Sequence, residues 1–277
     1  MTALTEEPWP SHADDAVDKP SLLLTAAEAA RVVVAVDAWL LAYPWLRRAP
    51  RGDGHPVLIL PGLMAGDAST LALRHVLRRL GYRPYKWHLG RNVGPTPAVR
   101  AELPAAVERI ARRNRSTVSI VGWSLGGIYA RELAHRHPES VRQVITLASP
   151  YRIRHSGQSR ADQAFTRYSH LHVWEGGREQ VVGTIRRPLT VPSTSIYSRL
   201  DGIVSWQQCI EPVGARAENI RVRSSHLGIG FDPQVLWAVI DRLSQAEGEW
   251  SPFVAPRLLA PFFPPPDRPQ EQALDVR

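Results

Sequence analysis

The residues with the clearest capacity for chemistry are in the segment Gly122-Trp123-Ser124-Leu125-Gly126-Gly127. An apolar stretch before it, residues 117–121, is predicted to form a strand, and a helix is predicted over residues 124–136. Small residues on both sides of Ser124 permit a tight strand-to-helix turn that presents the serine hydroxyl at the end of the strand. Free amides at the start of the helix favour negative charge that develops beside them. The pattern therefore indicates a nucleophilic serine.

This segment resembles the nucleophile motif of the α/β-hydrolase superfamily, and within it the small bacterial serine hydrolases of lipase and esterase type. The resemblance covers roughly residues 56–243. It implies attack by Ser124, an acyl-enzyme intermediate, and a catalytic acid and a histidine that follow the serine in that order along the chain. Because a triad and backbone amides suffice for this reaction, no metal and no organic cofactor are expected.

By this chain order, Asp201 is the expected acid and His226 is the expected base. Asp201 follows a strand predicted over residues 191–197, and His226 follows a strand predicted over residues 218–222. The resemblance implies that His226 takes the proton from Ser124 while Asp201 orients the imidazole and stabilises its cation.

Two other residues compete for these roles. Asp232 follows His226 in the chain and, standing directly before Pro233, is interpreted as a helix cap. His155 has a suitable distance from the serine but precedes Asp201, which breaks the family order. Both are therefore weaker candidates.

The resemblance also implies an oxyanion hole after the predicted strand over residues 57–60. That strand ends in Pro61-Gly62, where the family often carries His-Gly. Only backbone amides are needed at this position, so proline does not disable it. The expected donors are the backbone N–H groups of Leu63 and Leu125.

Short apolar runs alternate with helical patterns across the region, as expected for parallel βαβ units. Strands are predicted over residues 57–60, 82–87, 117–121, 143–147, 191–197 and 218–222, and helices over residues 69–80, 97–113, 124–136, 204–210 and 232–244. The predicted fold is α/β: an α/β-hydrolase fold with a mostly parallel, doubly wound sheet of about six strands and active groups at the carboxyl ends of the strands. A helical segment stands where larger relatives begin with an antiparallel hairpin, so the sheet is expected to be a reduced one.

Residues 151–190 are predicted to be an irregular, cap-like insertion over the substrate pocket. Phe165, Tyr168 and Trp174 supply enough apolar surface to wall a pocket. Four arginines of the insertion either recognise an acidic group of a substrate or are ordinary surface charges: Arg152, Arg154, Arg160 and Arg167.

The amino-terminal part divides into two segments. Residues 1–20 are polar and acidic, and they are predicted to be a disordered lead-in rather than a signal peptide. Residues 21–46 are predicted to form an apolar helix, and Glu28, Arg31 and Asp37 argue against a membrane span and for one polar side. So much apolar surface is expected to be buried on the flank of the sheet or at the edge left by the missing hairpin. Weak contact with a membrane surface stays open as an alternative.

The predicted organisation is a single domain over residues 21–249, followed by a proline-rich tail over residues 250–277. The 277 residues are 44% hydrophobic and 22% charged, which excludes a mostly disordered chain. One cysteine, Cys209, excludes an intramolecular disulfide and fits a reducing cytoplasm. The formal charge of +8 comes from arginines dispersed along helices, so no nucleic-acid partner is expected.

The function predicted from these residues is hydrolysis of carboxylic esters, with a small-molecule acyl ester or a lipid as substrate. An acyltransferase or thioesterase with the same triad is the alternative, and a non-catalytic binding scaffold is the third. Acyl-chain length and oligomeric state do not follow from the sequence.

Overall fold

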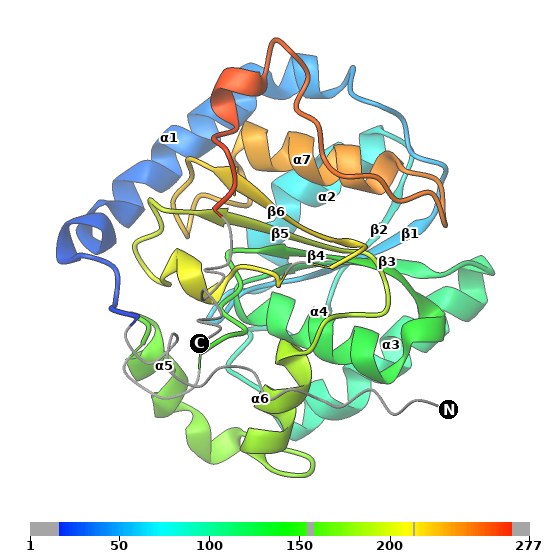
Figure 1. Cartoon of the computed structure of the whole chain (residues 1–277). Helices are drawn as coiled ribbons and strands as arrows, with labels where there is room; N and C mark the ends of the chain where they lie inside the picture. Colours follow the sequence, from blue (N-terminus) through cyan, green and yellow to red (C-terminus); the bar gives the residue numbers. More distant parts are fainter. Residues whose placement is uncertain (1–16, 154–157, 213, 268–277) are drawn as a thin grey trace, which may run out of the picture.

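A six-stranded parallel sheet forms the centre of the protein in a computed structural model that describes residues 17–153, 158–212 and 214–267 (Figure 1). The strands are β1 Pro56–Leu60, β2 Arg83–Tyr85, β3 Val118–Trp123, β4 Val141–Leu147, β5 Ser193–Ser198 and β6 Ala217–Val222. Their order is β2-β1-β3-β4-β5-β6, and every neighbouring pair is parallel. The predicted doubly wound α/β sheet is confirmed.

The strands differ in burial according to their place in the sheet. Every residue of β1, β3, β4 and β5 is buried, whereas β2 and β6 at the edges are partly exposed. Helices cover both faces of a parallel sheet, so the residues of its inner strands are buried throughout rather than alternately. The strand expected over residues 82–87 is shorter than predicted because only three residues of this edge pair with β1.

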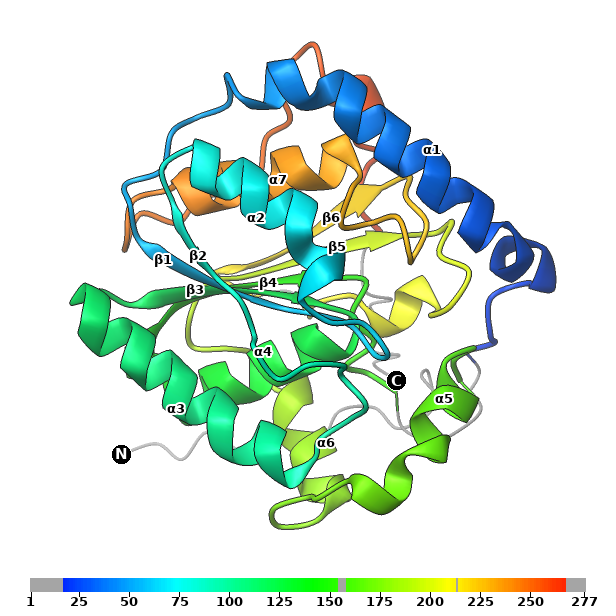
Figure 2. The same cartoon turned by 180° about the vertical axis from the view of Figure 1, so that it is seen from behind.

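Two layers of helices enclose the sheet. Helices α2 (Leu71–Arg79) and α7 (Pro233–Ser244) cover one face, and α3 (Pro97–Asn114) and α4 (Leu125–Arg136) cover the other (Figure 2). Each layer buries its own hydrophobic cluster against the sheet. Asp232 caps α7, since its side chain accepts a hydrogen bond of 2.9 Å from the N–H of Gln234. This agrees with its interpretation as a helix cap.

The insertion after β4 is more regular than predicted. It contains α5 (Asp162–Arg167) and α6 (Arg178–Arg186), so the expectation of an irregular segment is wrong. Helix α6 forms because Val181 and Ile185, one helical turn apart, bury their side chains against Tyr151. The short 3-10 helices of the chain are η1 Asp67–Thr70, η2 Pro138–Ser140, η3 Ser169–Leu171, η4 Trp206–Gln208 and η5 Ala260–Phe262.

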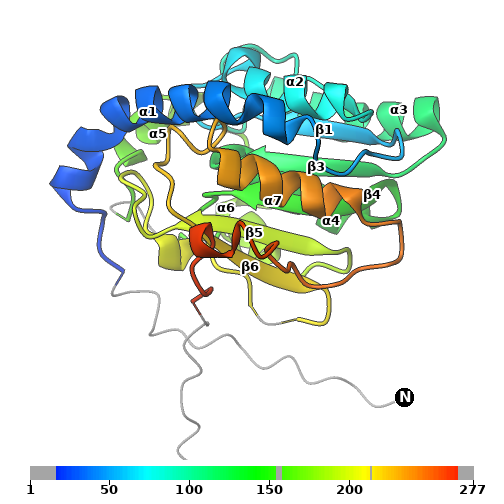
Figure 3. The ribbon, with the colours of Figure 1, turned by 90° about the horizontal axis from the view of Figure 1, so that it is seen from above.

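Helix α1 (Leu22–Leu46) crosses the outside of α7, and its first half extends beyond the carboxyl edge of the sheet (Figure 3). Its inner side packs on the core through Trp39, Tyr43 and Leu46. The expectation that its apolar surface is buried is wrong for the outward side, because one helix in a surface layer can bury only one of its sides. The expected single polar side is absent as well, since Glu28 is buried and Asp37 is exposed.

The described part of the carboxyl-terminal tail returns along the domain. Phe253 and Phe263 pack against the core, and the Asp267 carboxylate accepts a hydrogen bond of 3.0 Å from the hydroxyl of Tyr197. Of the expected disordered lead-in, residues 1–16 lie outside the described residues, as do residues 268–277 of the tail. In the described part of the chain, no helix combines the length and apolar character needed to cross a membrane.

Candidate active site

Ser124 occupies a strained turn between β3 and α4. Its φ of 53° and ψ of −118° are unfavourable for a residue with a side chain, and the turn is held by a hydrogen bond of 2.8 Å from the Ser124 N–H to the carbonyl of Leu147. A Cβ at Gly122 would lie 2.4 Å from the carbonyl oxygen of Gly126, and a Cβ at Gly126 would lie 2.4 Å from that of Leu60. Glycine is therefore required at both flanks, and the serine hydroxyl stands at the carboxyl edge of the sheet.

Asp201 and His226 meet at the same edge, after β5 and β6. The Nδ1 atom of His226 is 2.7 Å from Oδ2 of Asp201, and both side chains are buried. The other carboxylate oxygen of Asp201 accepts hydrogen bonds of 2.8 Å from the N–H groups of Ile203 and Val204. These contacts fix the carboxylate so that it can orient the imidazole.

The electrostatics of this pair favour a protonated imidazole. Burial alone lowers the pKa of His226, but the adjacent Asp201 carboxylate outweighs it, with a further contribution from Glu28, so that the pKa of His226 is raised above its usual value. A base with a raised pKa accepts a proton more readily from a serine hydroxyl.

The structure brings the expected acid and base together but does not join the expected base to the expected nucleophile. No hydrogen bond links the Ser124 hydroxyl to the His226 ring, both of which lie in the described part of the chain. Catalytic hydrogen bonds in ligand-free enzymes are often long and shorten when substrate binds.

The two expected oxyanion donors lie beside Ser124. The backbone N–H groups of Leu63 and Leu125 donate no hydrogen bond to any residue that the structure describes, and both residues line the same cavity as Ser124. Gly62 stands so close that a Cβ there would lie 3.2 Å from the Cβ of Ser124. Free amides near a nucleophile are what stabilisation of an oxyanion requires.

A cavity of about 390 Å³ opens next to Ser124, between α4 and the insertion. Its apolar wall includes Ile128, Phe165, Trp174, Val181 and Ile185. Tyr168, the third aromatic residue expected in the wall, does not line it.

The charged residues that line the cavity are not the four arginines of the insertion that the sequence offered for recognition of an acidic group. Arg100 and Arg178 line it, and Arg100 is neutralised by an ion pair with Glu132. Of the four arginines considered earlier, Arg160 instead donates two hydrogen bonds to the carbonyl of Pro20. Arg154 lies outside the described residues, and Arg152 and Arg167 do not line the cavity. Among the described residues, no group of three histidine, cysteine or acidic side chains is placed to hold a metal ion.

Known proteins share parts of this sequence. No family model matches the chain. A stretch of 57 residues is 44% identical to the pimeloyl-[acyl-carrier protein] methyl ester esterase of Neisseria meningitidis serogroup B, and a stretch of 98 residues is 32% identical to the protein of that name from Shewanella woodyi. These matches cover 20% and 35% of this chain but only 22% and 37% of the relatives. The chain thus matches well under half the length of these curated relatives.

Solved structures share the fold over part of this chain. Aspergillus fumigatus lipase B has a TM-score of 0.54 and 18% identity, with 72% of this chain and 55% of the lipase covered. The monoacylglycerol lipase of Paleococcus ferrophilus has a TM-score of 0.51 and 16% identity, with 71% and 96% covered. The chain has the α/β-hydrolase fold.

In this α/β-hydrolase fold, the site contains an acidic residue that the sequence did not predict there. Glu28 of α1 is only 2% exposed. Its Oε1 atom accepts hydrogen bonds from the N–H groups of Gly202 (2.8 Å) and His226 (2.9 Å), and its Oε2 atom accepts one from Leu227 (2.8 Å). One carboxylate of the amino-terminal helix thereby links the loop of Asp201 to the loop of His226.

Other contacts from α1 hold the loop that follows Asp201. The Thr25 hydroxyl donates to the carbonyl of Gly202 at 2.7 Å, and the guanidinium of Arg31 donates to the carbonyl of Leu200 at 2.5 Å. A Cβ at Gly202 would lie 2.5 Å from the carbonyl oxygen of Leu24, so this loop needs glycine to approach the helix. The sequence did contain a signal for the role of Glu28, since it is a carboxylate within an apolar helix. Such a group can be buried only where hydrogen-bond donors meet it.

Asn92 is a second residue that the sequence did not reveal. It is fully buried, and its Nδ2 atom donates a hydrogen bond of 2.9 Å to the carbonyl of Pro61. Its own carbonyl accepts a hydrogen bond of 2.7 Å from the N–H of Met64, and its N–H donates to Ala65. Asn92 thus holds both ends of the loop that carries Leu63. No motif around Asn92 signals this contact.

Proposed function

We propose that this protein is a serine hydrolase that cleaves carboxylic esters through an acyl-enzyme, with Ser124, His226 and Asp201 as its triad. The observation that carries the proposal is the strained turn at Ser124, which faces an apolar cavity and two free backbone amides. The Asp201–His226 pair at the same edge of the sheet supplies the base.

In the proposed reaction, Nε2 of His226 takes the proton of the Ser124 hydroxyl while Oγ attacks the ester carbonyl carbon. The N–H groups of Leu63 and Leu125 stabilise the resulting oxyanion. Collapse of the tetrahedral intermediate breaks the ester C–O bond, and His226 gives its proton to the departing alcohol. A water molecule, deprotonated by the same imidazole, then attacks the acyl-enzyme, and His226 returns this proton to Oγ of Ser124 as the acid leaves.

The cavity supports a small acyl ester as substrate. Its wall is largely apolar, and its volume of about 390 Å³ suits an acyl or alcohol group of moderate size. The names of the curated relatives, methyl ester esterases, agree with ester chemistry. A reducing, cytoplasmic location belongs to the same proposal and is supported by the single, buried Cys209.

A fluorophosphonate probe tests the nucleophile directly. The wild-type protein should be labelled at Ser124 and lose its turnover of nitrophenyl esters, and Ser124→Ala should abolish both labelling and turnover with unchanged thermal unfolding. Ser169→Ala is the matched control, because Ser169 lines the same cavity without the strained turn, and it should keep both properties. Labelling that persists in Ser124→Ala would refute the proposal. Release of free acid that is unaffected by added alcohol would distinguish hydrolysis from acyl transfer.

A further inference from the structure

The outward side of α1 is apolar along its whole length. Leu23 and Leu41, near its two ends, are 81% and 84% exposed. The other large apolar side chains exposed on the helix are Leu22, Val33, Val34, Leu40 and Trp45. A helix that packs on a soluble domain normally turns polar residues outward, whereas the one exposed charge between these residues is Asp37. An apolar strip about 37 Å long, interrupted by Asp37, therefore faces outward.

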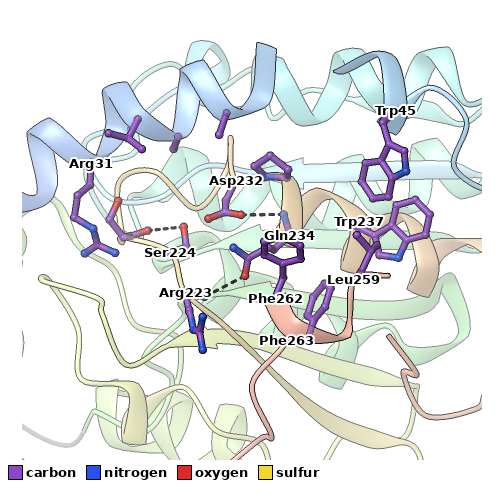
Figure 4. A pocket seen from close by; sticks show the side chains of 15 residues that line it. Arg31, Trp45, Arg223, Ser224, Asp232, Gln234, Trp237, Leu259, Phe262 and Phe263 are labelled. Carbon is purple, nitrogen blue, oxygen red and sulfur yellow. Dashed lines mark hydrogen bonds between the residues drawn. The ribbon is translucent and has the colours of Figure 1, made fainter. Parts of the chain in front are cut away.

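The strip continues onto the carboxyl-terminal segment. A groove of about 370 Å³ separates α1 from this segment, with Trp45 and Trp237 on one side and Phe262 and Phe263 on the other (Figure 4). Beyond the groove, the side chain of Leu258 is 90% exposed. We call the exposed apolar residues of α1, together with Leu258 and Phe262, the apolar face.

Basic residues border the apolar face. Arg47 and Arg48 directly follow α1, and Arg51 lies three residues further along the chain; all three are exposed and form no ion pair with a described residue. Lys19 precedes the helix, and Arg257 adjoins Leu258; both are exposed as well. The charges therefore lie where an apolar strip would meet anionic headgroups.

The two terminal segments outside the described residues are rich in polar and charged residues. Residues 1–16 carry four acids (Glu6, Glu7, Asp14 and Asp15), and residues 268–277 are mostly polar or charged. Neither segment has an apolar run comparable in length to the strip. A partner that covers the apolar face must therefore be apolar over a long distance and anionic where it meets the basic residues.

We propose that the apolar face docks onto the surface of an anionic lipid bilayer. Helix α1 lies flat, with its leucines among the acyl chains and Lys19, Arg47, Arg48 and Arg51 at the headgroups. The inner side of the helix meanwhile keeps its contacts with the loops of Asp201 and His226. This inference concerns a surface apart from the cavity and does not depend on the proposed esterase activity.

Flotation with lipid vesicles tests the docking, using the full chain and vesicles of phosphatidylcholine with or without phosphatidylglycerol. The wild-type protein should float with the mixed vesicles, and 0.5 M salt should weaken its binding. Leu23→Glu with Leu41→Glu should lower the partition coefficient by about tenfold or more for each leucine. Arg47→Glu with Arg48→Glu should remove the preference for phosphatidylglycerol.

Leu171→Glu is the matched control, because Leu171 is 41% exposed in η3 of the insertion, on the opposite side of the sheet from α1 (Figure 1), and its binding should stay within about twofold of wild type. All these side chains are exposed, so thermal unfolding and turnover of a soluble nitrophenyl ester should not change. A wild-type protein that fails to float would overturn the proposal. So would a dimer, seen by analytical ultracentrifugation, that the leucine substitutions dissociate, since the face would then bind a second copy of the chain.

Discussion

Replacement of Glu28 tests whether the amino-terminal helix positions the catalytic loops. The Glu28 carboxylate is the acceptor for three backbone N–H groups, the buried ones of Gly202 and His226 and the partly buried one of Leu227. Glu28→Ala leaves all three without this acceptor, at about 1 kcal/mol or more for each, so we expect a loss of about 3 kcal/mol or more in the free energy of unfolding. Glu28→Gln keeps the shape of the side chain and one acceptor oxygen. We expect it to keep the bonds from Gly202 and His226, lose that from Leu227, and cost about 1 to 2 kcal/mol.

The kinetic consequence separates positioning from general stability. A displacement of about 1 Å at a reacting group can lower the rate by about 10²-fold, so Glu28→Gln should lower kcat by about 10- to 100-fold. KM should change little, because Glu28 does not line the substrate cavity. The assay is hydrolysis of a nitrophenyl ester as a function of pH, together with thermal unfolding.

The pH profile gives the decisive readout. The Glu28 carboxylate contributes to the raised pKa of His226, and His226 must be neutral to act as base. Loss of that charge lowers the pKa of His226, so the acid limb of kcat/KM should move to lower pH in Glu28→Gln. The control, Thr25→Val, removes a hydrogen bond to the same loop without a change of charge, and its profile should not move. If Glu28→Gln kept kcat within twofold and left the acid limb in place, the positioning role would be refuted.

Four further predictions concern the triad, its pH dependence, the turn and the oxyanion loop. His226→Ala and Asp201→Asn should each lower kcat by several orders of magnitude, and the double variant should be little worse than the poorer single one; independent, additive losses would contradict a joint role. Wild-type kcat/KM should decline as the pH falls through the raised pKa of His226, and a limb below pH 5 would rule out this base. Gly126→Ala should destabilise the fold or abolish fluorophosphonate labelling, because its Cβ would collide with the carbonyl of Leu60; normal labelling and stability would argue against the close approach. Asn92→Ala should lower kcat by about tenfold or more with little change in KM, since the loop with the proposed oxyanion donor Leu63 loses its side-chain hydrogen bond at Pro61 and keeps only the backbone bonds to residue 92; an unchanged kcat would remove that role.

The sequence alone determined the features that depend on neighbours along the chain. The apolar runs and the helical patterns between them predicted a parallel α/β sheet, because period and composition are local properties. The glycines around Ser124 predicted the strained turn, since a Cβ at Gly122 or Gly126 would be excluded by backbone close by. The order of Asp201 and His226 after successive strands placed both at the carboxyl edge, where the structure joins them.

Tertiary structure alone decided the contacts between segments far apart in the chain. Glu28 meets the N–H of His226 across 198 residues, and Asn92 reaches Pro61 across 31, distances over which no periodicity carries information. Helix α1 also shows what a local pattern cannot predict. Apolar residues occur on all of its sides, and Asp37 does not share a side with Glu28 and Arg31, so the pattern contained no clear signal for the side that would face the core. The side that faces the core was decided by contacts with other elements: α1 packs against α7, and its buried Glu28 meets the N–H donors of the two loops. In this orientation Leu23 and Leu41 face outward.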